Sequence, residues 1–110
     1  MTVKNLTFEN FHEEVLVSDI PVIIDFFADW CAPCQMMSPA FDSLSEEFEN
    51  RLKFMKLDTQ AEEGLASQFE VRGIPALLVF KDGKEVDRIV GFAPEPILKA
   101  KIENILKKIE

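Results

Sequence analysis

Two cysteines three residues apart are the side chains most able to do chemistry in this sequence. Cys31 and Cys34 are the only cysteines, and they enclose Ala32 and Pro33 directly after Trp30. A structural bridge between residues so close in sequence would restrict the unfolded chain little. In a chain that looks intracellular, such a pair is more often redox-active or metal-binding. The pair therefore predicts thiol chemistry, with zinc binding as its rival.

Zinc binding lacks the ligands it needs. A closed zinc site takes four protein ligands, and beyond the cysteine pair the chain offers one histidine, His12. We therefore expect no metal. An inert pair is also disfavoured, because Trp30 and Pro33 place the cysteines at an exposed turn between a strand and a helix.

The position of the pair predicts a different role for each cysteine. Residues 22–28 form a β-branched and aromatic run typical of a central strand, and an apolar stripe at helical spacing follows from Cys34 to Phe48. Cys31 then lies at a helix N-terminus, where free N–H groups and the helix dipole favour a thiolate. We expect Cys31 to face solvent and Cys34 to be shielded. An exposed attacker and a buried resolving thiol are what thiol–disulfide exchange requires.

Asp25 is a carboxylate in the middle of the apolar strand. Burial without a partner is costly for the ionised form, so its pKa should rise toward neutrality. Such a group can accept the proton of Cys34 as that thiol attacks a mixed disulfide. Lys56, on a strand expected beside this one, would partly compensate the charge. A merely structural buried Asp25 is the alternative, since ion-pair networks also shift pKa values.

The rest of the pattern predicts a mixed α/β fold. Thr7 is a candidate N-cap for a first helix that buries Phe8, Thr59–Glu62 has the spacing of a capping box, and residues 81–84 form a hairpin turn. Strands and helices alternate until the hairpin, which indicates parallel pairing followed by an antiparallel pair. The expected strands are 3–6, 22–28, 52–57, 76–80 and 85–90. Helices should cover both faces of the sheet.

Length and charge exclude several classes of protein. A chain of 110 residues makes one domain, and its 47% apolar and 29% charged residues are a globular balance. A net charge of −8 repels phosphate backbones and anionic lipid, so we expect no nucleic acid and no membrane as partner. No apolar run approaches the roughly 18–20 residues of a membrane span, and residues 1–5 lead into no signal segment. We expect a cytoplasmic monomer.

These residues together resemble the thioredoxin family across the whole chain. The resemblance is carried by the motif from Trp30 to Cys34, together with Asp25, Lys56, Gly73-Ile74-Pro75, Gly83 and Gly91. It implies one thioredoxin domain over residues 1–110, with a five-stranded mixed sheet flanked by four α-helices. It also implies a cis peptide bond before Pro75 and packing of Pro75 against the cysteine pair. Substrate peptides would run along Trp30, Ile74, Pro75, Gly91 and Phe92.

The chemistry and the resemblance predict a protein-disulfide reductase. Cys31 attacks a protein disulfide, Cys34 resolves the mixed disulfide, and the chain is left with a redox-active Cys31–Cys34 disulfide. No tightly bound cofactor is expected, but a thioredoxin reductase, linked to NADPH or to ferredoxin, must restore the dithiol. The resemblance implies a part in electron transport and cell redox homeostasis.

Three residues depart from the common family pattern without changing the reaction class, and two alternative functions stay open beside the reductase. Ala32 replaces the usual Gly and should stiffen the turn, Gln35 replaces a basic residue that would help a thiolate, and Phe27 stands where a second Trp is frequent. One alternative is an oxidase or isomerase of secretory compartments, although no His lies between the cysteines. The other is a redox-independent binding module that docks through Trp30, Pro75 and Phe92.

Overall fold

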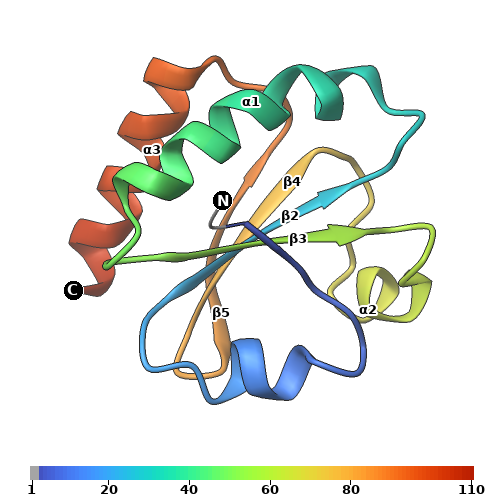
Figure 1. Cartoon of the computed structure of the whole chain (residues 1–110), viewed down its shortest axis with the longest axis horizontal. Coiled ribbons are helices and arrows are strands. Elements are labelled where there is room, and N and C mark those ends of the chain that lie inside the picture. Colours follow the sequence, from blue (N-terminus) through green and yellow to red (C-terminus); the bar gives the residue numbers. More distant parts are fainter. Residues whose placement is uncertain (1–2) are drawn as a thin grey trace.

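A five-stranded mixed sheet forms the centre of the computed structural model, which describes residues 3–110 (Figure 1). The strands are β1 (Lys4–Asn5), β2 (Val22–Phe27), β3 (Lys53–Asp58), β4 (Ala76–Lys81) and β5 (Lys84–Val90). Their order across the sheet is β1-β3-β2-β4-β5. β3 pairs in parallel with β1 and β2, and β4 pairs antiparallel with β2 and β5. The predicted parallel pairs and the terminal hairpin are confirmed, but the antiparallel pairing of β4 with β2 differs from the parallel pairing that the alternation of strands and helices indicates.

Four helical segments of the described chain cover the two faces of this sheet (Figure 1). α1 (Ala32–Glu47) and α3 (Glu95–Ile109) pack on one face, where their apolar stripes share a core cluster with β2, β3 and β4. η1 (His12–Leu16) and α2 (Glu63–Gln68) pack on the other face in a second cluster. This is the expected layering, except that η1 is a short π-helical turn and not an α-helix. In none of these helices is there a segment long and apolar enough to cross a lipid bilayer.

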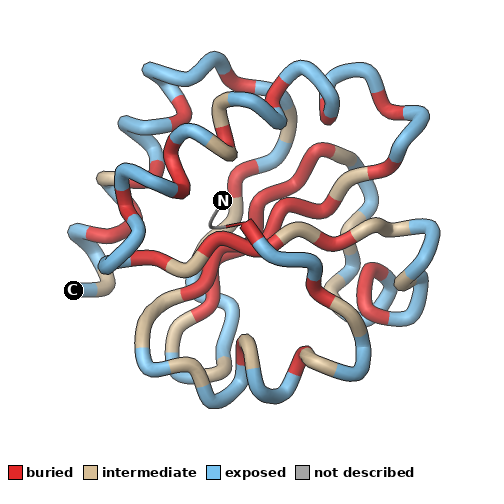
Figure 2. The backbone as a smooth tube through the Cα atoms, in the orientation of Figure 1, coloured by how far each residue is buried: buried red, intermediate tan, exposed pale blue. Residues whose placement is uncertain are grey.

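The alternation of side chains along β2 decides where the acidic residue points. Successive residues of a strand face opposite sides of the sheet. Ile23 belongs to the cluster under α1 and α3, whereas Ile24 and Phe26 belong to the opposite cluster. Figure 2 shows buried residues along the central strands and, at intervals, on the helices that cover them. Asp25 therefore lies on the face of Ile23, beneath α1.

Aromatic packing holds α1 over the parallel half of the sheet. The ring of Phe41 in α1 lies 4.9 Å from the ring of Phe54 in β3, centroid to centroid, and both side chains are fully buried. Burying each such side chain contributes about 1.5–3 kcal/mol. The helix that begins at the cysteine pair is thus fixed to the sheet by its middle turns.

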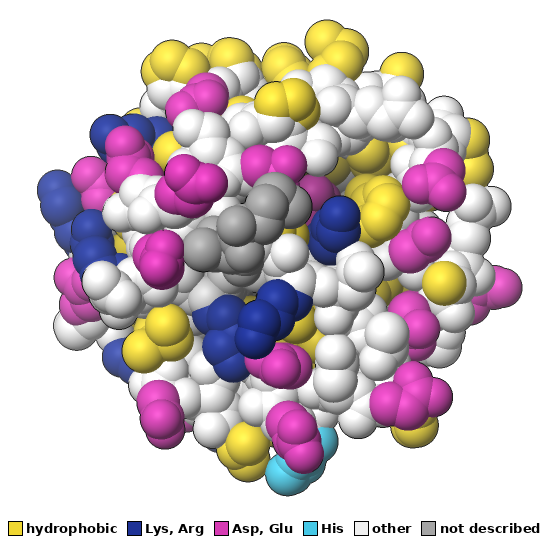
Figure 3. All heavy atoms as spheres, in the orientation of Figure 1, with side chains coloured by type: hydrophobic (Ala, Val, Ile, Leu, Met, Phe, Trp, Pro, Cys, Tyr) yellow, Lys and Arg dark blue, Asp and Glu magenta, His cyan; other side chains and the backbone are white. Residues whose placement is uncertain are grey.

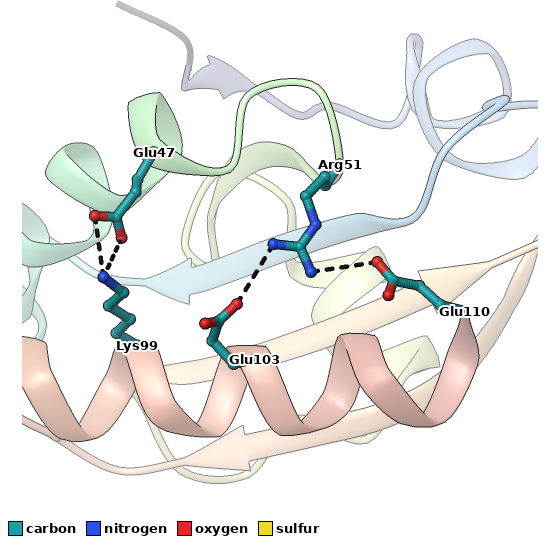
Figure 4. Close-up of polar contacts among 5 residues, drawn as sticks. All are labelled: Glu47, Arg51, Lys99, Glu103 and Glu110. Carbon is teal, nitrogen blue, oxygen red and sulfur yellow. Dashed lines mark hydrogen bonds and ion pairs between the residues drawn. The ribbon is translucent and has the colours of Figure 1, made fainter.

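Ion pairs on the surface link α3 to α1 and to the turn that follows α1 (Figure 4). Lys99 contacts Glu47 at 3.1 Å, and Arg51 contacts Glu103 at 3.4 Å and Glu110 at 3.3 Å. All five side chains are about half exposed, so each pair contributes at most about 1 kcal/mol. The apolar cluster, and not these contacts, carries most of the stability of this layer.

The start of the first helix differs from the prediction. The Thr7 hydroxyl does accept from the backbone N–H of Asn10 at 3.3 Å, as an N-cap would. That bond closes a separate turn, and the helix begins only at His12, where Val17 N–H donates to the His12 carbonyl at 3.1 Å. Phe8 is 74% exposed, so its predicted burial is wrong.

The predicted capping box at Thr59 is also wrong. The Thr59 hydroxyl donates to the carbonyl of Phe27 at 3.0 Å and ties the end of β3 to the end of β2. Asp58 Oδ1 accepts from the N–H groups of Gln60 and Ala61 instead, which makes a turn. α2 begins later, at Glu63, without a side-chain cap.

Candidate active site

The cysteine motif lies where β2 passes into α1, as the sequence predicts. Cys31 is the N-cap residue of α1, and its Sγ atom accepts a hydrogen bond from the backbone N–H of Cys34 at 3.2 Å. Pro33 lies in the first helical turn, where its missing N–H leaves no hydrogen bond unmade. The N–H group of Cys34 thus points at the sulfur of Cys31. A negative charge on that sulfur is favoured by this N–H group and by the helix dipole.

Cys31 and Cys34 form a disulfide, with Cα atoms 5.3 Å apart. This separation is ordinary for a disulfide. Both residues are buried, Cys31 at 5% and Cys34 at 3% exposure, so the expectation that Cys31 faces solvent is wrong for the oxidised form. The cause is local packing, because the pair clusters with Ala28 and with the partly buried Phe27 and Ile74.

The turn before β4, which contains Ile74 and Pro75, approaches the cysteine pair. The Ile74–Pro75 peptide bond is cis, as the resemblance implies, and the Ile74 carbonyl oxygen lies 3.9 Å from Cys31 Sγ. Gly91, at φ +95°, donates its N–H to the Pro75 carbonyl at 2.8 Å. This hydrogen bond joins the turn after β5 to the turn before β4. Residues that are distant in sequence are therefore brought together beside Cys31.

Exposed apolar side chains flank this junction. Trp30, directly before the pair, is 68% exposed, and Phe92, directly after Gly91, is 46% exposed. Figure 3 shows hydrophobic side chains along the top of the molecule, over the start of α1 and the turn from β5 to α3. A surface that holds large apolar groups in water is typical of a binding site.

Asp25 is a buried carboxyl group with an unmet polar atom. The side chain is 5% exposed, and Asp25 Oδ1 finds no hydrogen-bond partner among the described residues. Burial raises the pKa of Asp25 from 3.8 to about 7, with a further rise from the charge of Asp42 and an opposing effect of Lys56. The predicted rise toward neutrality is thus confirmed, and its main cause is the predicted one.

A cavity of about 200 Å³ connects this carboxyl group with Cys34. Both Asp25 and Cys34 line it, together with Lys56, which is the in-register neighbour of Asp25 on β3. A volume of this size has room for water molecules, each of which needs about 30 Å³. Water in this cavity could bridge Cys34 and Asp25, both of which line it. The remaining lining residues are Phe27, Ala28, Asp29, Gln35 and Ser38.

Two residues near this cavity were not singled out correctly from sequence. Asp42 is half-buried, and its charge raises the pKa of Asp25. Its spacing gives a signal, because Cys34, Ser38 and Asp42 follow at steps of four along one side of α1. Gln35 was noted only for its missing charge, yet its side-chain amide donates to the backbone carbonyl of Asp29.

Metal ligands do not converge anywhere in the described part of the chain. No group of three or more His, Cys, Asp or Glu side chains within residues 3–110 is arranged to hold an ion. His12 lies on η1, on the face of the sheet away from the cysteine pair.

Comparison with known proteins gives one consistent family. The thioredoxin family model matches residues 2–104. The chain is 44% identical over 103 residues to thioredoxin C-2 of Corynebacterium nephridii, with 94% of this chain and 95% of the relative covered. It is 42% identical over 97 residues to a thioredoxin of Synechocystis sp., with 88% and 91% covered. It is 37% identical over 106 residues to a thioredoxin of Porphyra purpurea, with 96% and 99% covered.

Site, fold and relatives agree on the reaction. The protein is a thiol–disulfide oxidoreductase, a protein-disulfide reductase that acts by dithiol–disulfide exchange through Cys31 and Cys34. The family implies protein disulfides as substrates and a reductase as partner. A cysteine pair at a helix N-terminus, on a five-stranded mixed sheet, in a chain matched over almost its whole length, places this protein in the thioredoxin family.

Proposed function

We propose that Cys31 is the attacking thiol of this reductase, Cys34 the resolving thiol and Asp25 the proton acceptor. The observation that carries this division of roles is the cavity that joins Asp25 to Cys34, while Cys31 holds the N-cap position of α1. The helix N-terminus favours a thiolate at Cys31. A carboxyl group with a pKa of about 7 is poised to take a proton near neutral pH.

The reaction then balances in two exchanges. The Cys31 thiolate attacks one sulfur of the substrate disulfide, which forms a mixed disulfide and releases the other substrate sulfur as a thiolate. Asp25 takes the proton of Cys34, whose thiolate attacks Cys31 Sγ and releases the second substrate sulfur. The substrate gains two electrons, and the chain ends with the Cys31–Cys34 disulfide.

The neighbours of the pair adjust this chemistry. Lys56 is in register with Asp25, and its positive charge opposes the rise in the pKa of that carboxyl group. Ala32 and Pro33 fix the first turn of α1 between the two sulfurs, since both have less backbone freedom than the Gly that Ala32 replaces. They keep Cys34 within reach of the mixed disulfide.

Substrate peptides bind across the exposed junction beside Cys31. Trp30 and Phe92 supply apolar surface, and Ile74, Pro75 and Gly91 supply backbone close to the cysteine pair. This arrangement recognises an extended segment by its backbone and by apolar contacts, so it suits many different disulfides.

Regeneration requires an external electron donor. A thioredoxin reductase, linked to NADPH or ferredoxin, returns two electrons to the disulfide, which gives the protein its part in electron transport and redox homeostasis. No tightly bound cofactor is needed, because the Cys31–Cys34 dithiol itself carries both electrons and gives them up when the disulfide forms. The chain acts as one domain over residues 1–110, as a monomer, in the cytoplasm.

A disulfide-reduction assay with the purified chain tests the proposal. The dithiol form is mixed with a protein that holds one accessible disulfide, and released thiols are counted. We expect one substrate disulfide reduced per chain. The Cys31→Ser, Cys34→Ser double variant is the control and should reduce none. Full cellular function of that double variant would instead support a redox-independent binding module.

A further inference from the structure

The cavity above Asp25 has a buried floor and an exposed rim. Asp25 and Cys34 form the floor, and both are at most 5% exposed. Asp29, Gln35 and Ser38 line the same cavity and are exposed, so they form its opening to solvent. The partly exposed Phe27 and Lys56 complete the upper wall of the cavity.

One hydrogen bond spans this rim. The side-chain amide Nε2 of Gln35, in the first turns of α1, donates to the backbone carbonyl of Asp29 in the loop that leaves β2. The backbone N–H of Gln35 donates to the carbonyl of Cys31 at 3.1 Å. The residue is therefore held by the helix at one end and ties the β2–α1 loop at the other.

We propose that Gln35 is a positioning residue that narrows the opening of the Asp25 cavity, by tying the loop before Trp30 to α1, and so limits the water that reaches the carboxyl group. The site already described contains the cavity, but nothing in the reaction scheme above uses the amide of Gln35. A glutamine suits this task because it donates a hydrogen bond and adds no charge.

Water access matters here because burial is the main cause of the raised pKa of Asp25. Asp25 Oδ1 has no partner among the described residues, so added water would give it a hydrogen bond and stabilise the carboxylate. The charged groups that face Asp25 or line its cavity are Lys56 from β3, Asp42 from α1 and Asp29 from the loop after β2, while its neighbour on β4 is the apolar Leu77. Removing the amide of Gln35 removes none of these charges. Its loss should therefore act through the hydration of the cavity.

The expected consequence for the reaction rests on the proposed role of Asp25. The resolving step needs the carboxylate form, so its rate rises with pH through the pKa of Asp25. A wetter cavity lowers that pKa, and the profile moves toward lower pH. The pKa of Asp25 and the pH profile of the resolving step can be measured separately. The role of Gln35 is therefore distinguishable from that of Asp25.

The deciding experiment follows the Asp25 carboxyl carbon by NMR in the oxidised full chain while pH is varied. Gln35→Met keeps length and helix preference but removes the donor. We expect the titration midpoint of Asp25 to fall by at least about half a pH unit. Gln68→Met, an exposed glutamine at the end of α2, is the matched control and should leave the midpoint unchanged. Equal midpoints in the two variants would overturn the proposal.

The rate of mixed-disulfide resolution is the second measurement. In Gln35→Met the pH profile should move to lower pH by the same amount as the NMR midpoint. Asp25→Asn is the reference in which this dependence on pH is lost. A midpoint that moves while the profile stays would remove Asp25 from the resolving step and still support the role of Gln35.

Discussion

Among single residues, Asp25 couples the chemistry of the site to the stability of the fold. A buried carboxyl group whose pKa rises from 3.8 to about 7 on folding binds its proton more tightly in the folded chain. Because tenfold in proton affinity is worth about 1.4 kcal/mol, this rise corresponds to roughly 4 kcal/mol. The folded state carries this penalty in full above pH 7 and loses it as pH falls toward 4. Burying this carboxyl group thus destabilises the protein at neutral pH.

Asp25→Asn should therefore stabilise the oxidised protein in a pH-dependent way. At pH 8 we expect the free energy of unfolding to increase by up to roughly 4 kcal/mol, since no charge is buried. At pH 4 the difference should nearly vanish, because the wild-type carboxyl group is protonated when folded. Urea unfolding at the two pH values measures the difference in the free energy of unfolding between the variant and the wild type. Asp19→Asn, an exposed carboxylate, is the control, and the same difference for Asp25→Asn at both pH values would contradict the account.

Among the helices and strands, the periodicity of apolar residues predicts those elements that bury their apolar side chains in the core. The stripe from Cys34 through Phe41 to Phe48 predicts α1, and the apolar run 22–28 predicts β2, because each element buries one face or both against the core. The hairpin was also predictable, because an Asp-Gly pair favours a turn with two positive φ angles. Asp82 and Gly83 both adopt positive φ in this turn.

Local hydrogen-bonding signals were less reliable than these periodic patterns. Thr7 and Thr59 both have the side chain of a helix cap, but the first closes a separate turn and the second bonds to β2. A threonine hydroxyl serves any nearby carbonyl or N–H group, so sequence spacing alone does not choose its partner. The burial of Cys31 was missed for a similar reason, because Ile74 reaches it from a distant part of the chain. The contact of Gln35 with Asp29 likewise depends on how the loop folds back.

Two glycines, one in a turn and one in a helix, provide a matched test of how the backbone conformation affects stability. Gly83 has φ +80°, and a Cβ there would lie 3.2 Å from the Leu16 carbonyl oxygen, so Gly83→Ala should destabilise the fold by about 1–2 kcal/mol. Gly64 lies within α2 with nothing within 4 Å of an added Cβ. Gly64→Ala should stabilise by about 0.5–1 kcal/mol. Urea unfolding measures both, and effects of equal sign would contradict the geometry.

For the whole molecule, charge and surface shape set the choice of partners more than the chemistry. The chain has a net charge of −8, whereas the surface beside Cys31 offers the apolar side chains of Trp30 and Phe92. Charge governs how fast a partner arrives, and apolar contact governs how long it stays. A partner that approaches this junction with basic residues around an apolar segment is therefore favoured.

The reduction potential of the whole protein separates a reductase from an oxidase or isomerase. The turn between the cysteines holds Ala32 and Pro33, with no histidine to stabilise the thiolate further and make the couple more oxidising. We expect equilibration against glutathione buffers to give a potential well below the value of about −180 mV found for protein disulfide isomerase. A potential at or above that value would favour the oxidising alternative.

Trapping the mixed disulfide shows which cysteine attacks the substrate and which one resolves the intermediate. The Cys34→Ser and Cys31→Ser variants are each reduced, incubated with a cytoplasmic extract, quenched in acid and analysed by mass spectrometry. Cys34→Ser keeps the thiol at the helix N-terminus but lacks the resolving thiol, so substrates should accumulate on Cys31. Cys31→Ser should carry almost none. Adducts that accumulate instead on Cys34 of the Cys31→Ser variant would reverse the two roles and contradict the account.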